Sequence, residues 1–133
     1  MNPLRFSKIL IVDDAQFFRY SIKKMLMEAQ IGSIYYEAKD GKEAITLYIK
    51  KRPNLVIMDI VMPNIDGVKA TQAIIQHDPK AKIIIISAKE NKEIVTNAIK
   101  SGAKDYVLKP FASGQVIMAV SKQLVTNRLQ NRI

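Results

Sequence analysis

The sequence contains no cysteine, and this absence excludes several classes of site. A disulfide scaffold, a zinc site with cysteine ligands, an iron–sulfur cluster and a thiol nucleophile all require that residue. The absence is compatible with a reducing compartment. The single histidine, His77, falls at the end of an expected helix, and we assign it no catalytic role. Any chemistry is therefore expected from carboxylates, hydroxyls and amines.

Long hydrophobic runs are absent as well. The longest aliphatic runs cover residues 9–12 and 83–86, whereas a membrane-spanning helix needs about 20 apolar residues. Residues 1–7 lack the apolar stretch of a signal peptide, and the first apolar run ends at Asp13. We therefore expect a cytoplasmic protein without membrane insertion.

The composition is that of one folded domain. The chain has 133 residues, of which 48% are hydrophobic and 25% charged, so a single domain over residues 1–133 is expected. Lysine and arginine number 21 against 12 acidic residues, a net charge of +9. No basic run is longer than residues 50–52, so the charge fits either solvated helix faces or a field that steers a partner. No helix-turn-helix pattern follows the last expected helix, and direct contact with nucleic acid is not expected.

Short apolar runs and helical patterns alternate along the whole chain. Apolar residues at helical spacing over residues 15–29 predict an amphipathic helix, with Gly32 as its expected C-cap. The four consecutive isoleucines of residues 83–86 predict a strand that is buried on both faces. The alternation predicts an α/β fold with five parallel strands and right-handed crossovers. The expected strands are residues 8–12, 33–38, 54–58, 83–86 and 104–108, and the expected helices are residues 15–29, 42–51, 68–77, 90–100 and 113–128.

Polar side chains follow four of the five expected strands. Asp13 and Asp14 follow the first strand, Asp59 the third, Ser87 the fourth and Lys109 the fifth. Because ligands of open α/β sheets bind at the carboxyl ends of the strands, these groups are expected to converge. Three carboxylates at close range repel one another, and a hard divalent cation such as Mg²⁺ would relieve that repulsion. Lys109 can neutralise a carboxylate or a phosphoryl oxygen, and Ser87 can donate a hydrogen bond to one.

Each of these residues also has an ordinary structural explanation. Asp14 could be only a helix N-cap, Ser87 a turn residue and Lys109 a solvated side chain. Tyr106 alone would be expected in the core. The conjunction of polar residues at four strand ends favours a functional site over these separate explanations.

Five motifs carry a resemblance to a known family. The chain resembles the receiver domain of bacterial two-component response regulators, most closely the stand-alone, CheY-like chemotaxis type, over about residues 7–125. The resemblance implies a (βα)5 doubly wound parallel sheet of the flavodoxin/CheY-like class, with strand order 2-1-3-4-5. The motifs are ILIVDD at 9–14, EAKDGKEA at 37–44, MDIVMPNIDG at 58–67, ISA at 86–88 and GAKDYVLKPF at 102–111.

The resemblance also implies a metal-dependent phosphoacceptor. Asp59 would accept a phosphoryl group from a histidine kinase. Asp13 and Asp14 would hold Mg²⁺ together with Asp59 and the backbone carbonyl of Val61. Lys109 and the hydroxyl of Ser87 would bind the phosphoryl oxygens.

A switch and a gate are implied around this site. Tyr106 would turn inward when Ser87 moves toward the phosphoryl group, and the Lys109–Pro110 peptide would be cis. Hydrolysis of the acyl phosphate needs an in-line water, so side chains that flank the site control its rate. Val61 is apolar and cannot orient a water, and Lys89 could lie across the mouth, so slow loss of the phosphoryl group is expected.

The implied function is a phosphorylation-dependent signalling switch. It would not be an enzyme in the usual sense, because it would catalyse only its own phosphorylation and dephosphorylation. Its fourth helix, fifth strand and fifth helix would form the surface read by an output protein, such as a flagellar motor switch or a histidine phosphotransfer protein, and a monomer is expected. That stretch is basic, which fits an acidic partner segment or simply solubility; its basic residues are Lys92, Lys100, Lys104, Lys122, Arg128 and Arg132.

Other functions stay open or fit less well. The chain ends soon after the last expected helix, which favours a stand-alone receiver; a phosphorelay intermediate or the receiver fragment of a longer transcriptional regulator is the alternative. An Mg²⁺-dependent aspartyl phosphohydrolase would need a second aspartate two residues after its nucleophile. That position is Val61 if the nucleophile is Asp59, and Ala15 if the nucleophile is Asp13. A flavodoxin-like FMN carrier would have its phosphate repelled by the carboxylates. A P-loop enzyme needs a GxxxxGK[ST] motif that the sequence lacks.

Overall fold

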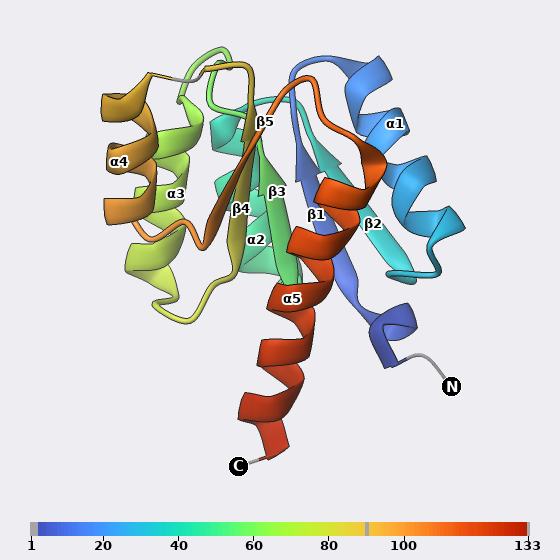
Figure 1. Cartoon of the computed structure of the whole chain (residues 1–133). Helices are drawn as coiled ribbons and strands as arrows, with labels where there is room; N and C mark the ends of the chain where they lie inside the picture. The colour runs from blue at the N-terminus through green and yellow to red at the C-terminus, as the bar shows by residue number, and fades with distance from the viewer. Residues whose placement is uncertain (1–2, 90, 133) are drawn as a thin grey trace.

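Five parallel strands form one sheet in the order β2-β1-β3-β4-β5, which confirms the predicted fold class and strand order (Figure 1). The structure, a computed structural model, describes residues 3–89 and 91–132, with side chains as far as residue 125. Every neighbouring pair of strands is parallel, so all strands end at the same edge. The strands are β1 (Lys8–Val12), β2 (Ile34–Ala38), β3 (Leu55–Met58), β4 (Ile83–Ser87) and β5 (Asp105–Leu108).

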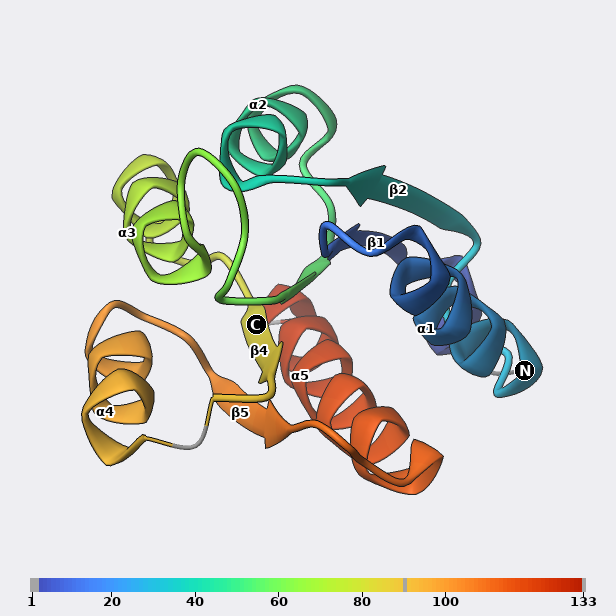
Figure 2. The same cartoon turned by 90° about the horizontal axis from the view of Figure 1, so that it is seen from above.

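Helices cover both faces of the sheet. The view from above in Figure 2 shows two helices, α1 and α5, on one face and three, α2, α3 and α4, on the other. Each helix returns the chain from the carboxyl edge of the sheet to the opposite edge. The helices are α1 (Gln16–Glu28), α2 (Gly41–Lys51), α3 (Gly67–His77), α4 (Lys92–Lys100) and α5 (Ser113–Arg132).

Alternate residues of the central strands enter two separate cores. Ile9 and Ile11 of β1 pack beneath α1 and α5, whereas Leu10 and Val12 pack beneath α2, α3 and α4. The isoleucines 83–86 of β4 alternate in the same way, and none is more than 1% exposed. The isoleucine run of β4 is therefore buried on both faces of the sheet, as predicted, and β1 is buried in the same way.

The start of α3 lies against the end of β3. The amide of Gly67 donates a hydrogen bond to the carbonyl of Ile60 at 2.8 Å. A Cβ atom at Gly67 would lie 2.0 Å from the carbonyl oxygen of Asp59, so no side chain fits between the two backbones. Asp66 caps the helix by accepting a hydrogen bond from the amide of Lys69 at 2.9 Å. This local geometry holds the loop after β3 over the carboxyl edge of the sheet.

Near its amino terminus the chain contains an element that was not predicted. A short 3₁₀ helix, η1 (Pro3–Phe6), precedes β1, and the carbonyl of Leu4 accepts a hydrogen bond from the amide of Gly32 at 2.9 Å. The prediction that Gly32 caps α1 is wrong, because the C-cap is Ala29. Gly32 instead has φ +89°, a left-handed conformation that suits glycine, in the connection to β2.

Boundaries differ by a few residues elsewhere. Ser87 is the last residue of β4, whereas it was expected just after the strand. The helix expected from residue 90 begins at Lys92, and Glu90 lies outside the described residues. α5 continues beyond the expected residue 128 to Arg132. Among the described residues, no helix is both long enough and apolar enough to cross a membrane.

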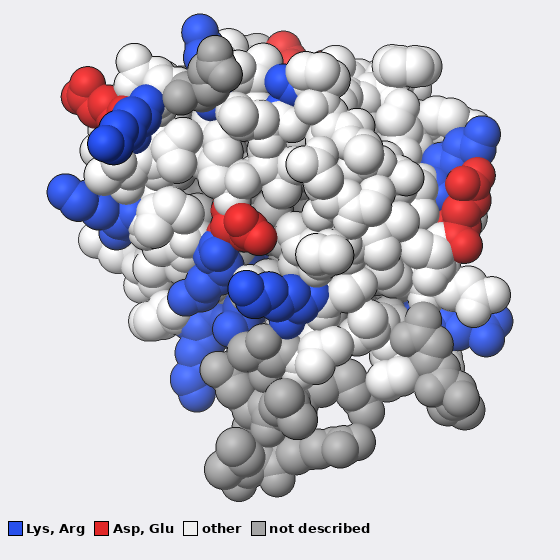
Figure 3. Space-filling model, viewed as in Figure 1, with Lys and Arg blue, Asp and Glu red and all other residues white. Residues whose placement is uncertain are grey.

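Basic side chains dominate the face formed by α4, β5 and α5. Lys92, Lys100, Lys104 and Lys122 are all exposed, as the sequence predicts for a solvated surface. Figure 3 shows the blue side chains gathering where α4 ends and β5 begins, with few red side chains among them. The side chains of residues 128 and 132, which were predicted to extend this basic face, lie outside the described side chains.

Candidate functional site

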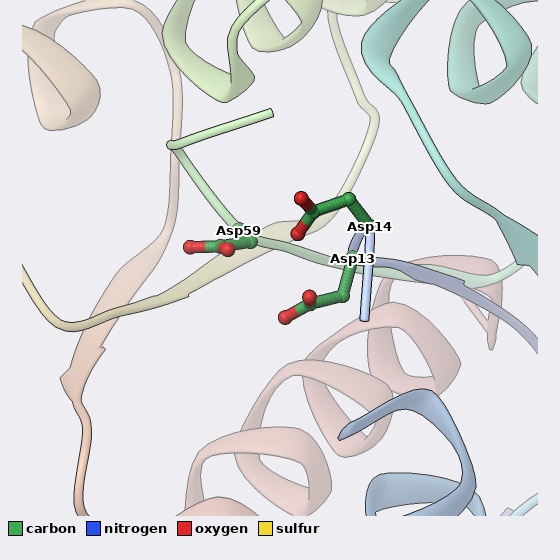
Figure 4. A group of neighbouring side chains, drawn as sticks. All are labelled: Asp13, Asp14 and Asp59. Atoms are coloured by element: carbon green, nitrogen blue, oxygen red, sulfur yellow. The ribbon is translucent and has the colours of Figure 1, made fainter. Parts of the chain in front are cut away.

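The carboxyl ends of β1 and β3 bring the first group of predicted site residues together. Val12 and Met58 are partners in the β1–β3 pairing, and the amide of Asp59 donates a hydrogen bond to the carbonyl of Val12 at 2.9 Å. Asp13 and Asp59 therefore leave adjacent strands at the same level. Figure 4 shows their carboxylates and that of Asp14 directed toward a common space.

Three carboxylates form a compact cluster at this edge. One oxygen from each of Asp13, Asp14 and Asp59 lies within 4.8 Å of the others. Asp13 is 2% exposed and Asp59 is 8% exposed, whereas Asp14 faces solvent. The alternative that Asp14 is only a helix cap is wrong, because Ala15 is the N-cap of α1 and no side chain caps it. The cluster therefore presents one exposed and two buried carboxylates to the same space.

Lys109 supplies a positive charge to the two buried carboxylates. Its Nζ lies 2.9 Å from Oδ2 of Asp13 and 3.6 Å from Oδ2 of Asp59. The residue follows β5, whose partner β4 ends at Ser87, and the amide of Lys109 donates a hydrogen bond to the Ser87 carbonyl at 2.9 Å. The Lys109–Pro110 peptide is cis, which confirms that prediction.

The charge on Asp59 is held at a free-energy cost. Burial raises the pKa of the Asp59 carboxyl above its usual range, the Lys109 ammonium opposes the rise and the Asp13 carboxylate adds to it. Oδ1 of Asp59 accepts a hydrogen bond from the amide of Ile60 at 2.8 Å, which leaves the other oxygen facing the cluster. One carboxylate oxygen is thus anchored and the other is positioned to react or to bind a cation.

The donor set fits a hard divalent cation. Three carboxylate oxygens at this spacing are hard ligands, and one lysine does not neutralise three negative charges. Both oxygens of Asp13 are oriented by neighbours, because Oδ1 accepts a hydrogen bond from the amide of Ala15 at 2.9 Å and Oδ2 accepts one from Lys109 at 2.9 Å. Asp13, Asp14 and Asp59 are therefore residues that could hold a metal ion.

Ser87 and Tyr106 come from the two strands beside the cluster. Ser87 is 1% exposed, and its Oγ accepts a hydrogen bond from the amide of Lys89 at 3.3 Å. Tyr106 is half-buried, and its hydroxyl donates a hydrogen bond to the carbonyl of Lys89 at 2.5 Å. Both hydroxyls thus contact the backbone of the same residue, Lys89, in the β4–α4 loop.

The two residues expected to control access, Val61 and Lys89, lie on different loops at the carboxyl edge of the sheet. Val61 lies two residues beyond Asp59, and its side chain is 55% exposed. Lys89 lies two residues beyond Ser87 and is exposed. Among the described residues, Lys89 forms no ion pair with these carboxylates.

Sequence reasoning missed three residues that contact the site. Arg19 donates a hydrogen bond to the backbone carbonyl of Asp13 at 2.6 Å and forms an ion pair with Glu37 at 3.0 Å. The ring of Phe18 lies beneath the Lys109 ammonium, and Phe111 packs edge-on against that ring. Helical periodicity placed Phe18 on the core face of α1, but it carries no information about a partner so far along the chain.

Comparison with known proteins agrees with this geometry. A family model described as the response regulator receiver domain matches residues 9–121. Protein CcdB of Bacillus subtilis is 48% identical over 116 residues, which cover 87% of this chain and 96% of CcdB. The chemotaxis protein CheY of Listeria monocytogenes is 42% identical over 115 residues, which cover 86% of this chain and 96% of that protein.

A solved structure extends the likeness to three dimensions. A chain of the CheX–CheY–BeF3–Mg²⁺ complex from Borrelia burgdorferi superposes with a TM-score of 0.83 at 30% identity, covering 87% of this chain and 87% of that chain. The shared fold, the family match and the relatives agree with one another. The chain therefore belongs to the family of response regulator receiver domains and is a CheY-like member of it.

Proposed function

We propose that this protein is a phosphorylation-dependent switch whose phosphoacceptor is Asp59. One observation carries the proposal: the carboxylates of Asp13, Asp14 and Asp59 meet within 4.8 Å, with the Lys109 ammonium 3.6 Å from Asp59. A cluster of this kind suits a divalent cation and a phosphoryl group together, because each neutralises charge that the other brings. The family to which the chain belongs supports the same function.

The reaction is a direct displacement at phosphorus. An oxygen of the Asp59 carboxylate attacks the phosphorus of a phosphohistidine, the O–P bond forms and the P–N bond breaks. The imidazole nitrogen keeps the electron pair and takes up a proton. Lys109 and the Ser87 hydroxyl bind the phosphoryl oxygens in the product.

Mg²⁺ is the cation we propose for the cluster. The ligands would be Asp13, Asp14, Asp59 and the backbone carbonyl of Val61, and the ion would neutralise charge on the phosphoryl oxygens. The oxygen-only donor set supports this choice, and a related chain at 30% identity was solved in a complex with Mg²⁺. The chain's own part is to orient the carboxylates and to keep Lys109 beside them.

The output is a change in the surface formed by α4, β5 and α5. Phosphorylation would draw Ser87 toward the phosphoryl group and release the β4–α4 loop, so that the Tyr106 ring turns inward. The shared contact of both hydroxyls with the Lys89 backbone supports this coupling. We propose a histidine kinase as donor and an output of the chemotaxis type, which relatives named CheY support. A phosphorelay role through a histidine phosphotransfer protein is the alternative.

Acetyl phosphate with Mg²⁺ tests the phosphoacceptor. We expect phosphate-affinity gel electrophoresis to resolve a slower band for the wild type and none for Asp59→Asn. Asp66→Asn is the matched control, because Asp66 caps α3 and asparagine caps equally well. Labelling of Asp59→Asn at the wild-type rate would overturn the assignment.

Calorimetric titration tests the metal ligands separately. Wild type should bind Mg²⁺ without any phosphodonor, and Asp14→Ala should lose this binding while it remains folded, because Asp14 is exposed. Unchanged Mg²⁺ affinity in Asp14→Ala would remove that residue from the ligand set.

A further inference from the structure

The ammonium group of Lys109 has an aromatic neighbour as well as two acidic ones. Its Nζ lies 3.7 Å from the centroid of the Phe18 ring, close to the distance of its ion pair with Asp59. A cation over a ring face is attracted by the negative charge density of that face. Phe18 therefore contacts the active amine although it has no polar atom of its own.

The Phe18 ring is itself held in place. Phe111 packs against it at a centroid distance of 5.7 Å and an interplanar angle of 89°, an edge-to-face arrangement that aromatic pairs favour. Phe111 lies two residues after Lys109, so the loop that supplies the amine also supplies the residue that orients the ring. Both rings pack on the core beneath α1 and α5.

This arrangement matters because Asp13, which also contacts Lys109, is a proposed metal ligand. The shortest contact of Lys109, at 2.9 Å, is to Asp13, which the proposed function also uses as a metal ligand. A cation on Asp13 weakens the attraction between that carboxylate and Lys109, whose side chain is 21% exposed and could then turn toward solvent. The Phe18 ring is not a metal ligand and keeps its attraction for the amine when the cation binds.

We propose that Phe18 is a positioning residue that holds the Lys109 ammonium beside Asp59, with Phe111 holding the ring. The inference rests on the proposed function, in which Lys109 binds the phosphoryl oxygens. Leucine at position 18 would fill much of the same apolar space but would desolvate the ammonium without attracting it. Tyrosine would keep the ring face, so the two substitutions separate packing from attraction.

Proton NMR tests the contact without any phosphodonor. A ring face at this distance shields nearby protons, so the ε-methylene protons of Lys109 should resonate upfield of those of exposed lysines in wild type. We expect Phe18→Leu to remove this shift and Phe17→Leu to retain it. Phe17 is the matched control, because it neighbours Phe18 on α1 but is 79% exposed. An unshifted Lys109 in the wild type would overturn the inference.

Phosphorylation kinetics test the consequence. We expect Phe18→Leu to lower the second-order rate constant with acetyl phosphate by about three- to tenfold, the range that corresponds to one cation–π contact. Phe18→Tyr and Phe17→Leu should stay within about twofold of wild type. The dissociation constant for Mg²⁺ should also change by less than about twofold in Phe18→Leu, because the ring is not a ligand.

The outcomes separate this inference from the proposed function. If the wild type is not phosphorylated on Asp59, the proposed function fails, while the NMR shift still reports whether the ring holds the amine. If the wild type is phosphorylated and Phe18→Leu reacts like Phe17→Leu, the positioning role is wrong. If Phe18→Leu fails to fold, the test relies on Phe18→Tyr. Equal phosphorylation rates in wild type and Phe18→Tyr, with the upfield shift in both proteins, would support the positioning role. A Phe18→Tyr rate as low as that of Lys109→Ala would overturn it.

Discussion

At the scale of single residues, the site is organised around a carboxylate that the fold does not fully stabilise. Asp59 is nearly buried, has a second carboxylate beside it and shares one lysine with that neighbour. Its raised pKa is the sign of this cost, because burial disfavours the charged form. A divalent cation bound to the three carboxylates would relieve this repulsion, because it adds positive charge where one lysine is not enough.

Asp59→Asn should therefore stabilise the metal-free protein. An acid whose pKa is raised in the folded state destabilises that state once it is ionised, so the gain is largest near neutral pH and shrinks as the pH falls through the raised pKa. We expect a gain on the order of 1 kcal/mol in urea unfolding with EDTA present. Added Mg²⁺ should narrow the difference, because it binds the folded wild type. A variant less stable than wild type at neutral pH would contradict this explanation.

The flanking residues should set the lifetime of the acyl phosphate. Val61 cannot orient a water and Lys89 can cover the mouth, so we expect the Val61→Asn, Lys89→Glu double variant to lose its phosphoryl group about five- to tenfold faster, a barrier change of roughly 1 kcal/mol. The decay is followed by phosphate-affinity gel electrophoresis after removal of the donor. Each single variant serves as a control for the other position. A double variant that decays no faster than wild type would show that these side chains do not gate the site.

At the scale of secondary-structure elements, a side-chain hydrogen bond joins α2 to the end of α3. The hydroxyl of Tyr48 in α2 donates a hydrogen bond to Oδ2 of Asp78, the C-cap residue of α3, at 2.8 Å. Burial, followed by the neighbouring Asp78 carboxylate, raises the pKa of Tyr48 well above its usual value. The tie therefore stays intact throughout the neutral pH range.

Tyr48→Phe should weaken this pair of helices without affecting the site. The variant loses a partly buried hydrogen bond to a charged acceptor, and we expect a loss of about 1–2 kcal/mol in the free energy of unfolding, constant across neutral pH. Tyr20→Phe is the control, because Tyr20 is 59% exposed and should change stability little. Labelling by acetyl phosphate should be unchanged in both. Equal stability of the two variants would mean that the Tyr48–Asp78 contact contributes nothing.

At the scale of the whole molecule, the exposed lysines and Tyr106, the proposed switch residue, lie on one face. The net charge of +9 is expressed strongly on α4, β5 and α5, where exposed lysines surround the strand that carries Tyr106 (Figure 3). Exposed charges act over about 10 Å at 0.1 M salt, so they affect the rate of encounter more than the stability of a complex. The basic face fits an acidic partner segment.

Association with a candidate flagellar motor switch protein should therefore depend on salt. We expect the on-rate in surface plasmon resonance to fall as the ionic strength rises from low to physiological values, and to fall less steeply in Lys92→Ala, Lys122→Ala. Lys24→Ala is the control, because Lys24 is exposed on α1, outside that face. An on-rate that is the same in the double variant and in wild type at low salt would leave only a solubility role for these lysines.

The sequence by itself was sufficient for the architecture and for most of the site. Apolar runs that are buried on both faces and helices between them specify a doubly wound sheet, and parallel strands necessarily end at one edge. The polar residues after β1, β3 and β5 therefore lie along one edge, which is why the sequence alone places Asp13, Asp59 and Lys109 at the same end of the sheet. These are local patterns combined with one rule of topology.

Tertiary structure decided the features that depend on contacts across the chain. Ala15 rather than Asp14 occupies the N-cap position of α1, and the Asp14 carboxylate is directed into the cluster. η1 contacts the connection between α1 and β2, where the amide of Gly32 donates a hydrogen bond to the carbonyl of Leu4. No local sequence pattern predicts this contact. Phe18 shows the limit most clearly: helical spacing places it on an apolar face, but only the packing of α1 against the loop after β5 puts its ring beneath Lys109. Periodicity reports which face of a helix is buried, whereas the identity of the group it meets is set by how distant elements dock.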